Sequence, residues 1–499
     1  MLRGVIRFVV FILLLCFLHR AVLAQESFVY TNNHSGVFAS GINTVSAFTV
    51  GEDGVFREIP NSPFETAGRA LHSSTPNGDI IVVGNHLYVG NGGAVNAVGT
   101  VISPSVSGFS INPSTGNLTP VPGSPFSLGG VTLIEMTFGA TADGRFFYLA
   151  NLRDRTISAF SIGGEGSLVA IPGASYSVGT QISNMRVSQD GRFLAASVHP
   201  GVNMYRIGSD GGLTLVSGSP FFHSPSYGFS SLDINCDGTR MFGVKPDGLG
   251  TIEVYSISPT GTLAYLASAP SVQRFGANTT YGLVSPNGQY LFVSDFSVNR
   301  CIASFAVAST GSLSIVPGSP FSIGTSGVTI ESVPGGLATN NTGTILYSSL
   351  RRNIIGAYAI STSGALSPLP GSALAARNVD ILTEIYALAA YPARTCQTGP
   401  SFDICVQDDS NGNLLKLNSI AGDYQFNNCS GFTLGGTGGV IKKGSIVTLQ
   451  HYIGDRRVLA RVDTSINRGT ASIQVFSSGG TFTVTDRNTN DNTCACTVH

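Results

Sequence analysis

Short apolar runs separated by glycine-containing turns follow one another along most of the chain, as in FYLAN (147–151), TISAFSI (156–162) and TIEVYSI (251–257). Runs of five to seven residues bounded by turn signals predict β-strands. Several of these runs carry apolar residues on both faces, which is typical of strands covered on both sides. The pattern therefore predicts an all-β protein.

The turns recur in seven copies of one unit. Each copy has a tight turn followed by a hydrophobic residue, and a second landmark, most often rich in Pro and Ser, shortly after it. The turns are EDGVF (52–56), STGNL (114–118), GEGSL (164–168), SDGGL (209–213), PTGTL (259–263), STGSL (309–313) and TSGAL (362–366). The second landmarks are PNSPF (60–64), PGSPF (122–126), PGASY (172–176), SGSPF (217–221), ASAPS (267–271), PGSPF (317–321) and PGSAL (370–374). Such periodicity predicts a repeat architecture.

Each unit predicts four strands, and the turn joins the third strand to the fourth. A four-stranded blade covered on both faces cannot bury them alone, so the seven units are expected to close into a seven-bladed β-propeller over residues 25–393. The first unit begins at a second strand, FVYTN, and lacks a first strand before it. An unpaired run, EIYALAAYP, follows the seventh unit. We therefore predict that residues 384–391 supply the inner strand of the first blade and close the ring.

The repeat resembles the lactonase-like seven-bladed propellers and the related YVTN-repeat surface proteins. The second-strand runs and the phrase at 157–173, with its ISAFSI, GSL and IPG segments, carry this resemblance over roughly residues 26–392. The chain has no Trp, on which WD-repeat, Asp-box sialidase and quinoprotein propellers rely. The resemblance implies one of two things, namely a soluble enzyme acting on sugar-phosphate lactones or muconate-type acids, or an exported protein without assigned chemistry.

The enzyme-like members commonly carry an Arg-His pair on an inner strand, at a fixed distance before the turn that precedes the second strand. At that distance this chain has pairs such as Met136-Thr137, Ser183-Asn184 and Ser230-Ser231. In the second unit Arg69 and His72 lie close to the position but out of register. The pair is missing in every unit that aligns, which argues against lactonase chemistry taken over from the family.

Composition and the N-terminus bear on where the protein acts. Charged residues are 11% of the chain, and without residues 1–24 it holds 24 basic and 28 acidic residues. Neither nucleic acid nor an anionic membrane surface is expected as a partner. Arg3 and Arg7, an 11-residue apolar stretch and Val22-Leu23-Ala24 predict a signal peptide over residues 1–24. We expect a secreted, periplasmic or cell-surface monomer that is not inserted in the membrane after cleavage.

Five residues are candidates for a site. Arg186 and Asp233 stand five residues before the turn glycine in consecutive units and are expected to meet between blades, either orienting a ligand carboxylate or hydroxyl or forming a structural ion pair. Glu135 lies at an inner strand, as do Glu331 and Glu384, and an acid there could take part in hydrolysis. Arg69 and His72 complete the set, since histidine is the natural base for hydrolysis near neutral pH.

The composition changes after the predicted ring. Residues 394–499 hold Cys396, Cys405, Cys429, Cys494 and Cys496 and several short strand-like runs. They predict a small β-sandwich with disulfides, whose pairing stays open. Cys236 and Cys301 lie in different blades and are expected to be isolated. No CxxC pair or calcium-loop pattern occurs, so neither a metal nor a cofactor is expected.

Two functions remain. The first is an exported propeller that binds a small molecule, a glycan or a surface protein without catalysis. The alternative is a secreted lactonase-type hydrolase that opens sugar lactones. The sequence leans towards the first, and whether the protein is an enzyme stays open at this point.

Overall fold

The computed structural model describes residues 27–34, 42–51, 53–69, 79–95, 101–129, 135–223, 228–247, 250–269, 281–294, 301–308, 310–322, 334–350, 354–377 and 384–394, and seven strands between 402 and 486. These residues form strands and no helix. Within these ranges no helix is long and apolar enough to cross a membrane. The predicted signal peptide lies outside the described residues. The prediction of an all-β protein is confirmed.

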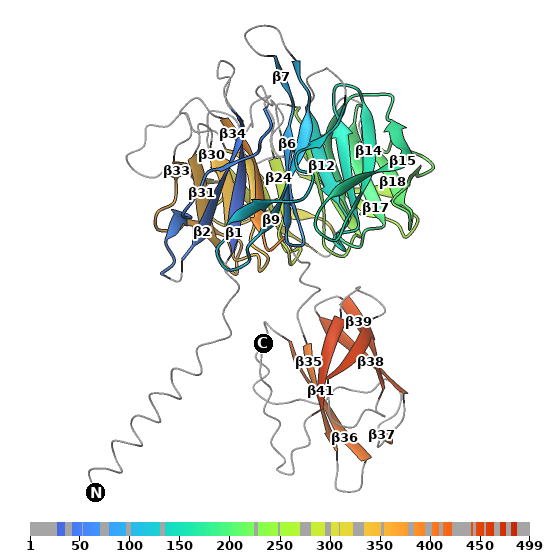
Figure 1. Cartoon of the computed structure of the whole chain (residues 1–499). Helices are drawn as coiled ribbons and strands as arrows, with labels where there is room; N and C mark the ends of the chain where they lie inside the picture. Colours follow the sequence, from blue (N-terminus) through green and yellow to red (C-terminus); the bar gives the residue numbers. More distant parts are fainter. Residues whose placement is uncertain are drawn as a thin grey trace, which may run out of the picture.

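The seven predicted units form seven sheets of four or five strands in a ring, which is a seven-bladed β-propeller (Figure 1). We number the blades in chain order and give their strands from the inside of the ring outwards. Blade 1 consists of β34 (Glu384–Tyr391), β1 (Phe28–His34), β2 (Thr44–Val50) and β3 (Phe56–Glu58), with β4 (Phe64–Glu65) on β2. Blade 2 consists of β5 (Ile80–Val83), β6 (His86–Asn91), β9 (Ser105–Ile111) and β10 (Leu118–Pro120), with β11 (Phe126–Ser127) on β9. The short ribbon of β7 (Ala94–Val95) and β8 (Val101–Ile102) extends from blade 2.

The remaining blades follow the same plan. Blade 3 consists of β12 (Met136–Ala140), β13 (Phe146–Asn151), β14 (Thr156–Ile162) and β15 (Leu168–Ser177), and blade 4 of β16 (Ile182–Val187), β17 (Phe193–Val198), β18 (Val202–Ile207) and β19 (Leu213–Leu215). Blade 5 consists of β20 (Ser231–Ile234), β21 (Arg240–Val244), β22 (Ile252–Ile257) and β23 (Leu263–Ala269). Blade 6 consists of β24 (Tyr281–Val284), β25 (Tyr290–Ser294), β26 (Cys301–Val307) and β27 (Leu313–Ile315), with β28 (Phe321–Ser322) on β26. Blade 7 consists of β29 (Pro334–Thr339), β30 (Ile345–Leu350), β31 (Ile354–Ile360) and β32 (Leu366–Pro368), with β33 (Leu374–Ala375) on β31.

The ring closes as the sequence predicts. Strand β34, late in the chain, pairs antiparallel with β1 in register from Phe28 opposite Tyr391 to Thr31 opposite Leu388, and the two lie side by side in Figure 1. The Tyr391 ring stacks on Phe28, and its hydroxyl donates a hydrogen bond to Asn85 of blade 2 at 2.8 Å. The inner position of blade 1 is thereby filled, and the inner edge of β1 is paired.

The two repeated landmarks have distinct structural roles. The serine of the second landmark accepts a hydrogen bond from a backbone N–H of the third strand in five blades, at 2.9–3.1 Å; these serines are Ser62, Ser124, Ser219, Ser319 and Ser372. In every unit except the first, the turn glycine packs against the preceding blade. Its carbonyl accepts a hydrogen bond from a tyrosine there in three cases, Tyr30 to Gly116, Tyr88 to Gly166 and Tyr148 to Gly211.

Burial raises the pKa of each of these three tyrosines, so each hydroxyl remains a donor at physiological pH. The repeated bonds therefore join blade 1 to blade 2, blade 2 to blade 3 and blade 3 to blade 4.

The tail contributes seven described strands. They are β35 (Phe402–Asp408), β36 (Asn413–Ala421), β37 (Ile441–Lys442), β38 (Ile446–Ile453), β39 (Arg456–Asp463), β40 (Thr470–Val475) and β41 (Thr481–Asp486). They pair in the order β37-β36-β35-β41-β40-β39-β38. Whether this sheet folds into a two-layer sandwich stays a prediction, as do the tail disulfides. In the ring, the sulfur of Cys236 is disulfide-bonded, so the expectation that this residue is isolated is wrong.

Candidate functional site

The inner strands of all seven blades surround one cavity of about 460 Å³ in the channel. Each blade contributes at least one side chain to its wall; one from each, in blade order, is Ala389, Val82, Phe138, Arg186, Asp233, Leu283 and Thr339. The wall is mainly aliphatic, because the channel side of these inner strands continues their apolar pattern. The few polar side chains in it therefore define the chemistry that the cavity offers.

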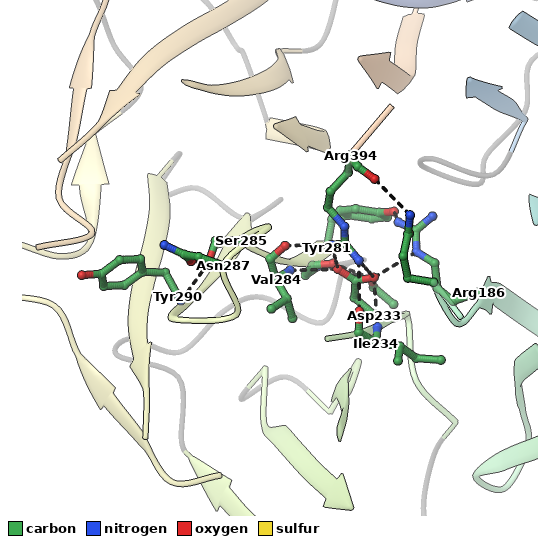
Figure 2. Close-up of polar contacts among 12 residues, drawn as sticks. Arg186, Asp233, Ile234, Tyr281, Val284, Ser285, Asn287, Tyr290 and Arg394 are labelled. Atoms are coloured by element: carbon green, nitrogen blue, oxygen red, sulfur yellow. Dashed lines mark hydrogen bonds and ion pairs between the residues drawn. The ribbon is translucent and has the colours of Figure 1, made fainter. Parts of the chain in front are cut away.

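Asp233 is the buried acid of this cavity, and its side chain is 4% exposed. The backbone N–H of Ile234 donates to one carboxylate oxygen at 3.0 Å, and that of Val284 in blade 6 donates to the other at 2.9 Å. Two arginines lie against the same carboxylate (Figure 2). These contacts engage both oxygens of Asp233, so it is not a free general base.

Arg394 makes the closer of the two ion pairs. Its Nη1 lies 2.8 Å from Asp233 Oδ2 and also donates to the Val284 carbonyl, while Nη2 donates to the Ile234 carbonyl at 3.0 Å. The amide of Gln189 in blade 4 donates to the Arg394 carbonyl at 3.3 Å. The first residue of the predicted tail domain therefore binds three blades of the propeller.

Arg186 makes the second pair, with Nε 3.6 Å from Asp233 Oδ1. The expected meeting of Arg186 and Asp233 between consecutive blades is present. Its Nη2 donates to the Tyr281 hydroxyl of blade 6 (Figure 2). Burial of the guanidinium opposes its charge, but the neighbouring Tyr281 and Asp233 outweigh burial and raise the pKa of Arg186. Arg186 is therefore a permanent cation in the cavity wall.

The charges do not cancel. The three charged side chains among the described lining residues are Arg186, Asp233 and Arg394, so the cluster carries one net positive charge. The side chain of Arg186 is 25% exposed, and its Nε has no hydrogen-bond partner within the described part of the chain. A guanidinium has five N–H donors. Arg186 thus keeps donors for a further acceptor in the cavity.

Thr339 in blade 7 is a further polar residue of the wall that sequence analysis did not single out. The residue is 3% exposed, and its hydroxyl has no hydrogen-bond partner among the described residues. Burying an unpaired hydroxyl is costly, so such a group is a natural contact for a bound molecule. No sequence signal separates Thr339 from the many other threonines.

The other predicted candidates lie elsewhere. Arg69 and Glu135 both precede inner strands and do not line the cavity, whereas Arg186 and Asp233 lie near the opposite ends of theirs. His72 and Glu331 lie outside the described residues, and only the backbone of Glu384 is described. The structure therefore brings together Arg186 and Asp233 of the five, and a catalytic role for any of the five stays a prediction.

A metal site is not evident in the described ranges, where no three His, Cys, Asp or Glu residues form a group suited to hold an ion. The polar side chains that line the cavity are two guanidiniums, a paired carboxylate, two amides and hydroxyls. They suit a hydrogen-bonded organic ligand better than a divalent cation.

Solved structures share this architecture. A proposed 6-phosphogluconolactonase from Bacteroides fragilis aligns over 74% of this chain and 99% of its own, with a TM-score of 0.53 and 17% identity. By fold, the chain is a seven-bladed β-propeller similar to this structure. A proposed 6-phosphogluconolactonase from Bacteroides uniformis aligns with this propeller over 73% of the chain and 99% of its own, with a TM-score of 0.55 and 16% identity. The periplasmic gluconolactonase of Pseudomonas aeruginosa aligns over 72% of this chain and 99% of its own, with a TM-score of 0.53 and 17% identity.

No protein-family profile and no curated protein matches the sequence. At this level of identity the shared feature is the fold, and the predicted resemblance to lactonase-like seven-bladed propellers is confirmed at the level of the fold. The resemblance to YVTN-repeat proteins stays a prediction.

Proposed function

We propose that the propeller binds a small hydroxy acid in its central channel, without catalysing a reaction on it. The observation that carries the proposal is the Arg186 guanidinium, which faces the cavity with donors to spare and belongs to a cluster with one net positive charge. A carboxylate is the natural partner of a guanidinium, because the two form charge-assisted, often bidentate hydrogen bonds.

The wall opposite Arg186 indicates that the ligand also carries a hydroxyl. Arg186 and Thr339 come from blades 4 and 7, so the cavity lies between them. A ligand with a carboxylate on Arg186 and a hydroxyl near Thr339 would satisfy both. A cavity of about 460 Å³ suits a molecule of the size of a sugar acid.

Binding is favoured over hydrolysis because the described residues of the cavity wall offer no free base. Its acid, Asp233, accepts two backbone N–H groups and faces two arginines, and the wall contains no histidine among the described residues. Ring opening of a lactone needs a group that activates water.

A panel of hydroxy acids tests the proposal through their effect on the thermal unfolding of the protein. Circular dichroism monitors the unfolding, because the chain has no Trp to serve as a fluorescent probe. A ligand that binds only the folded state stabilises it by about 2.7 kcal/mol at one hundred times its Kd. We expect a saturable rise in Tm with at least one small hydroxy acid and none with its uncharged amide. If no acid in the panel raises Tm, the proposal fails.

Lactone hydrolysis is the second candidate, supported by the similarity of the fold to proposed 6-phosphogluconolactonases and to a periplasmic gluconolactonase. A lactone yields a hydroxy acid, which would fit the same cavity. Acid release in a pH-stat against sugar and aliphatic lactones separates the two. We expect no turnover; turnover that Arg69→Ala/His72→Ala abolishes would instead identify a hydrolase with its site at blade 2.

We also propose that the protein acts after export, on the strength of its N-terminal pattern. The expected mature chain begins at Gln25, and the intact mass of the secreted protein measures this directly.

A further inference from the structure

A polar contact recurs within the blades, between an asparagine at the end of the second strand and a serine of the third strand. In blade 1 the amide of Asn33 donates to the Ser46 hydroxyl at 2.9 Å, and in blade 2 the amide of Asn91 donates to Ser107 at 2.8 Å. All four residues are at most 2% exposed. The contact therefore satisfies polar groups that the packing of the blades removes from water.

Blade 1 completes this contact in blade 2 through Thr66, which follows β4. The Thr66 hydroxyl donates to Oδ1 of Asn91 at 2.9 Å, and its carbonyl accepts a hydrogen bond from Ser107 at 2.6 Å. The interface between blades 1 and 2 is thus filled by hydrogen-bonded side chains at this point.

Leu128 takes the place of Thr66 at the next interface, between blades 2 and 3. The backbone N–H of Thr66 donates to the carbonyl of Asn43, the residue before β2, at 2.9 Å. The N–H of Leu128 likewise donates to the carbonyl of Pro104, the residue before β9, at 3.1 Å. A leucine side chain has no donor or acceptor, so blade 2 does not complete the polar contact of blade 3.

The polar residues of blade 3 are arranged differently as a result. Asn151 lies opposite Thr156, as Asn91 lies opposite Ser105, but its amide donates to Oδ2 of Asp154 at 2.9 Å instead of to the third strand. The hydroxyls of Thr156 and Ser158 make no hydrogen bond within the described part of the chain. Both face the space between blades 2 and 3.

This space is a pocket of about 460 Å³. Leu128, Leu149 and Phe160 give it an apolar floor that is continuous with the hydrophobic core between the two blades. Thr156, Ser158, Asn151 and Asp154 supply polar groups, and Asp154 is the charged side chain among the described lining residues. The pocket therefore joins an apolar surface to hydroxyls and a carboxylate.

We propose that the pocket between blades 2 and 3 binds one ring of a neutral sugar, as a second site separate from the channel. The C–H groups on one face of a sugar ring pack on an apolar surface such as that of Phe160 and Leu128. The sugar hydroxyls donate to the Asp154 carboxylate and exchange hydrogen bonds with Ser158. The carboxylate disfavours an anionic ligand here, in contrast to the cationic channel.

Saturation-transfer NMR with methyl glucoside, methyl galactoside and methyl mannoside tests the proposal. We expect transfer to at least one of them, strongest for the protons on one face of its ring. Ser175→Phe should abolish the transfer, because Ser175 is exposed, lies opposite Ser158 and lines the pocket. Ser158→Ala, which adds no bulk, should weaken binding about three- to tenfold.

Ser268→Phe is the matched control. Ser268 is exposed on the outer strand of blade 5 and lies opposite Glu253, which has the repeat position of Ser158 but is paired with Lys245 at 2.5 Å. This variant and Arg186→Gln in the channel should both bind the sugar as the wild type does. Absence of transfer to all three glycosides, transfer that persists in Ser175→Phe, or loss in either control would overturn the proposal.

Discussion

At the scale of single residues, the cavity wall contains one acid, Asp233, that pairs with two arginines. The Asp233 side chain is 4% exposed, and those of Arg186 and Arg394 are 25% and 20% exposed. Removing one partner of a buried pair leaves an uncompensated charge, which costs more than the pair contributed. We expect Asp233→Asn to lower the free energy of unfolding by about 2–4 kcal/mol.

A double-mutant cycle of Asp233→Asn with Arg394→Gln in urea unfolding measures this interaction. The coupling energy should be about 1 kcal/mol or more. Additive effects of the two substitutions would mean that the ion pair does not contribute to stability.

His86 predicts a pH dependence of stability. Its ring packs against the Gly166 turn and lies 6.4 Å from the Tyr88 ring, and burial lowers the pKa of the imidazole. The unfolded state therefore binds the proton more readily, so stability contributed by this residue is present above the unfolded-state pKa of about 6.5 and is lost as the pH falls below it.

Unfolding of His86→Gln between pH 5 and 8 measures this effect. The variant should lose less stability than the wild type on acidification. A His86→Gln profile parallel to that of the wild type would contradict the assignment.

At the scale of elements, the repeated turn glycine is needed for two reasons. Gly211 has φ +82°, and a Cβ there would lie 2.5 Å from the Phe146 ring and 2.8 Å from Ile171 of the preceding blade. Gly54 in the first unit has φ +73°, but a Cβ there would meet nothing within 4 Å. Both glycines satisfy the turn, and only Gly211 also allows a close approach between blades.

These two positions form a matched pair of variants. Gly54→Ala should cost about 1 kcal/mol through backbone strain, and Gly211→Ala about 1–3 kcal/mol more through overlap with its neighbours. Urea unfolding of both proteins measures the difference. Equal losses would show that the turn conformation alone explains the repeat.

The elements were predictable because turn glycines and apolar periodicity are local signals. Of the polar residues that form the site in the cavity, only some were predictable from the sequence. Arg186 and Asp233 share a repeat position, so their meeting followed from the repeat. Arg394 pairs with Asp233, from which it is separated by 161 positions in the sequence. Because Arg394 comes after the change in composition, the sequence analysis assigned it to the tail. No sequence signal marks Thr339, because only the folded ring shows that its hydroxyl has no hydrogen-bond partner among the described residues.

At the scale of the whole molecule, stability depends on ring closure by β34. A chain of residues 25–380 lacks this strand and leaves the inner edge of β1 unpaired, whereas a chain of residues 25–394 retains it. Since each blade buries its faces on its neighbours, we expect only the longer chain to unfold cooperatively as a monomer. Size-exclusion chromatography and thermal unfolding compare the two, and equally cooperative unfolding would contradict closure by this strand.

The central claim is that the channel binds a hydroxy acid between Arg186 and Thr339, and calorimetric titration of the best acid from the panel tests it most directly. Thr339→Val is the sharpest variant because the hydroxyl it removes has no partner in the described residues, so the fold should be unharmed. We predict about five- to tenfold weaker binding for Thr339→Val and a larger loss for Arg186→Gln. Arg192→Gln, which changes an exposed arginine of the same blade, should bind as the wild type does. Unchanged affinity in both Arg186→Gln and Thr339→Val would contradict the channel as the binding site.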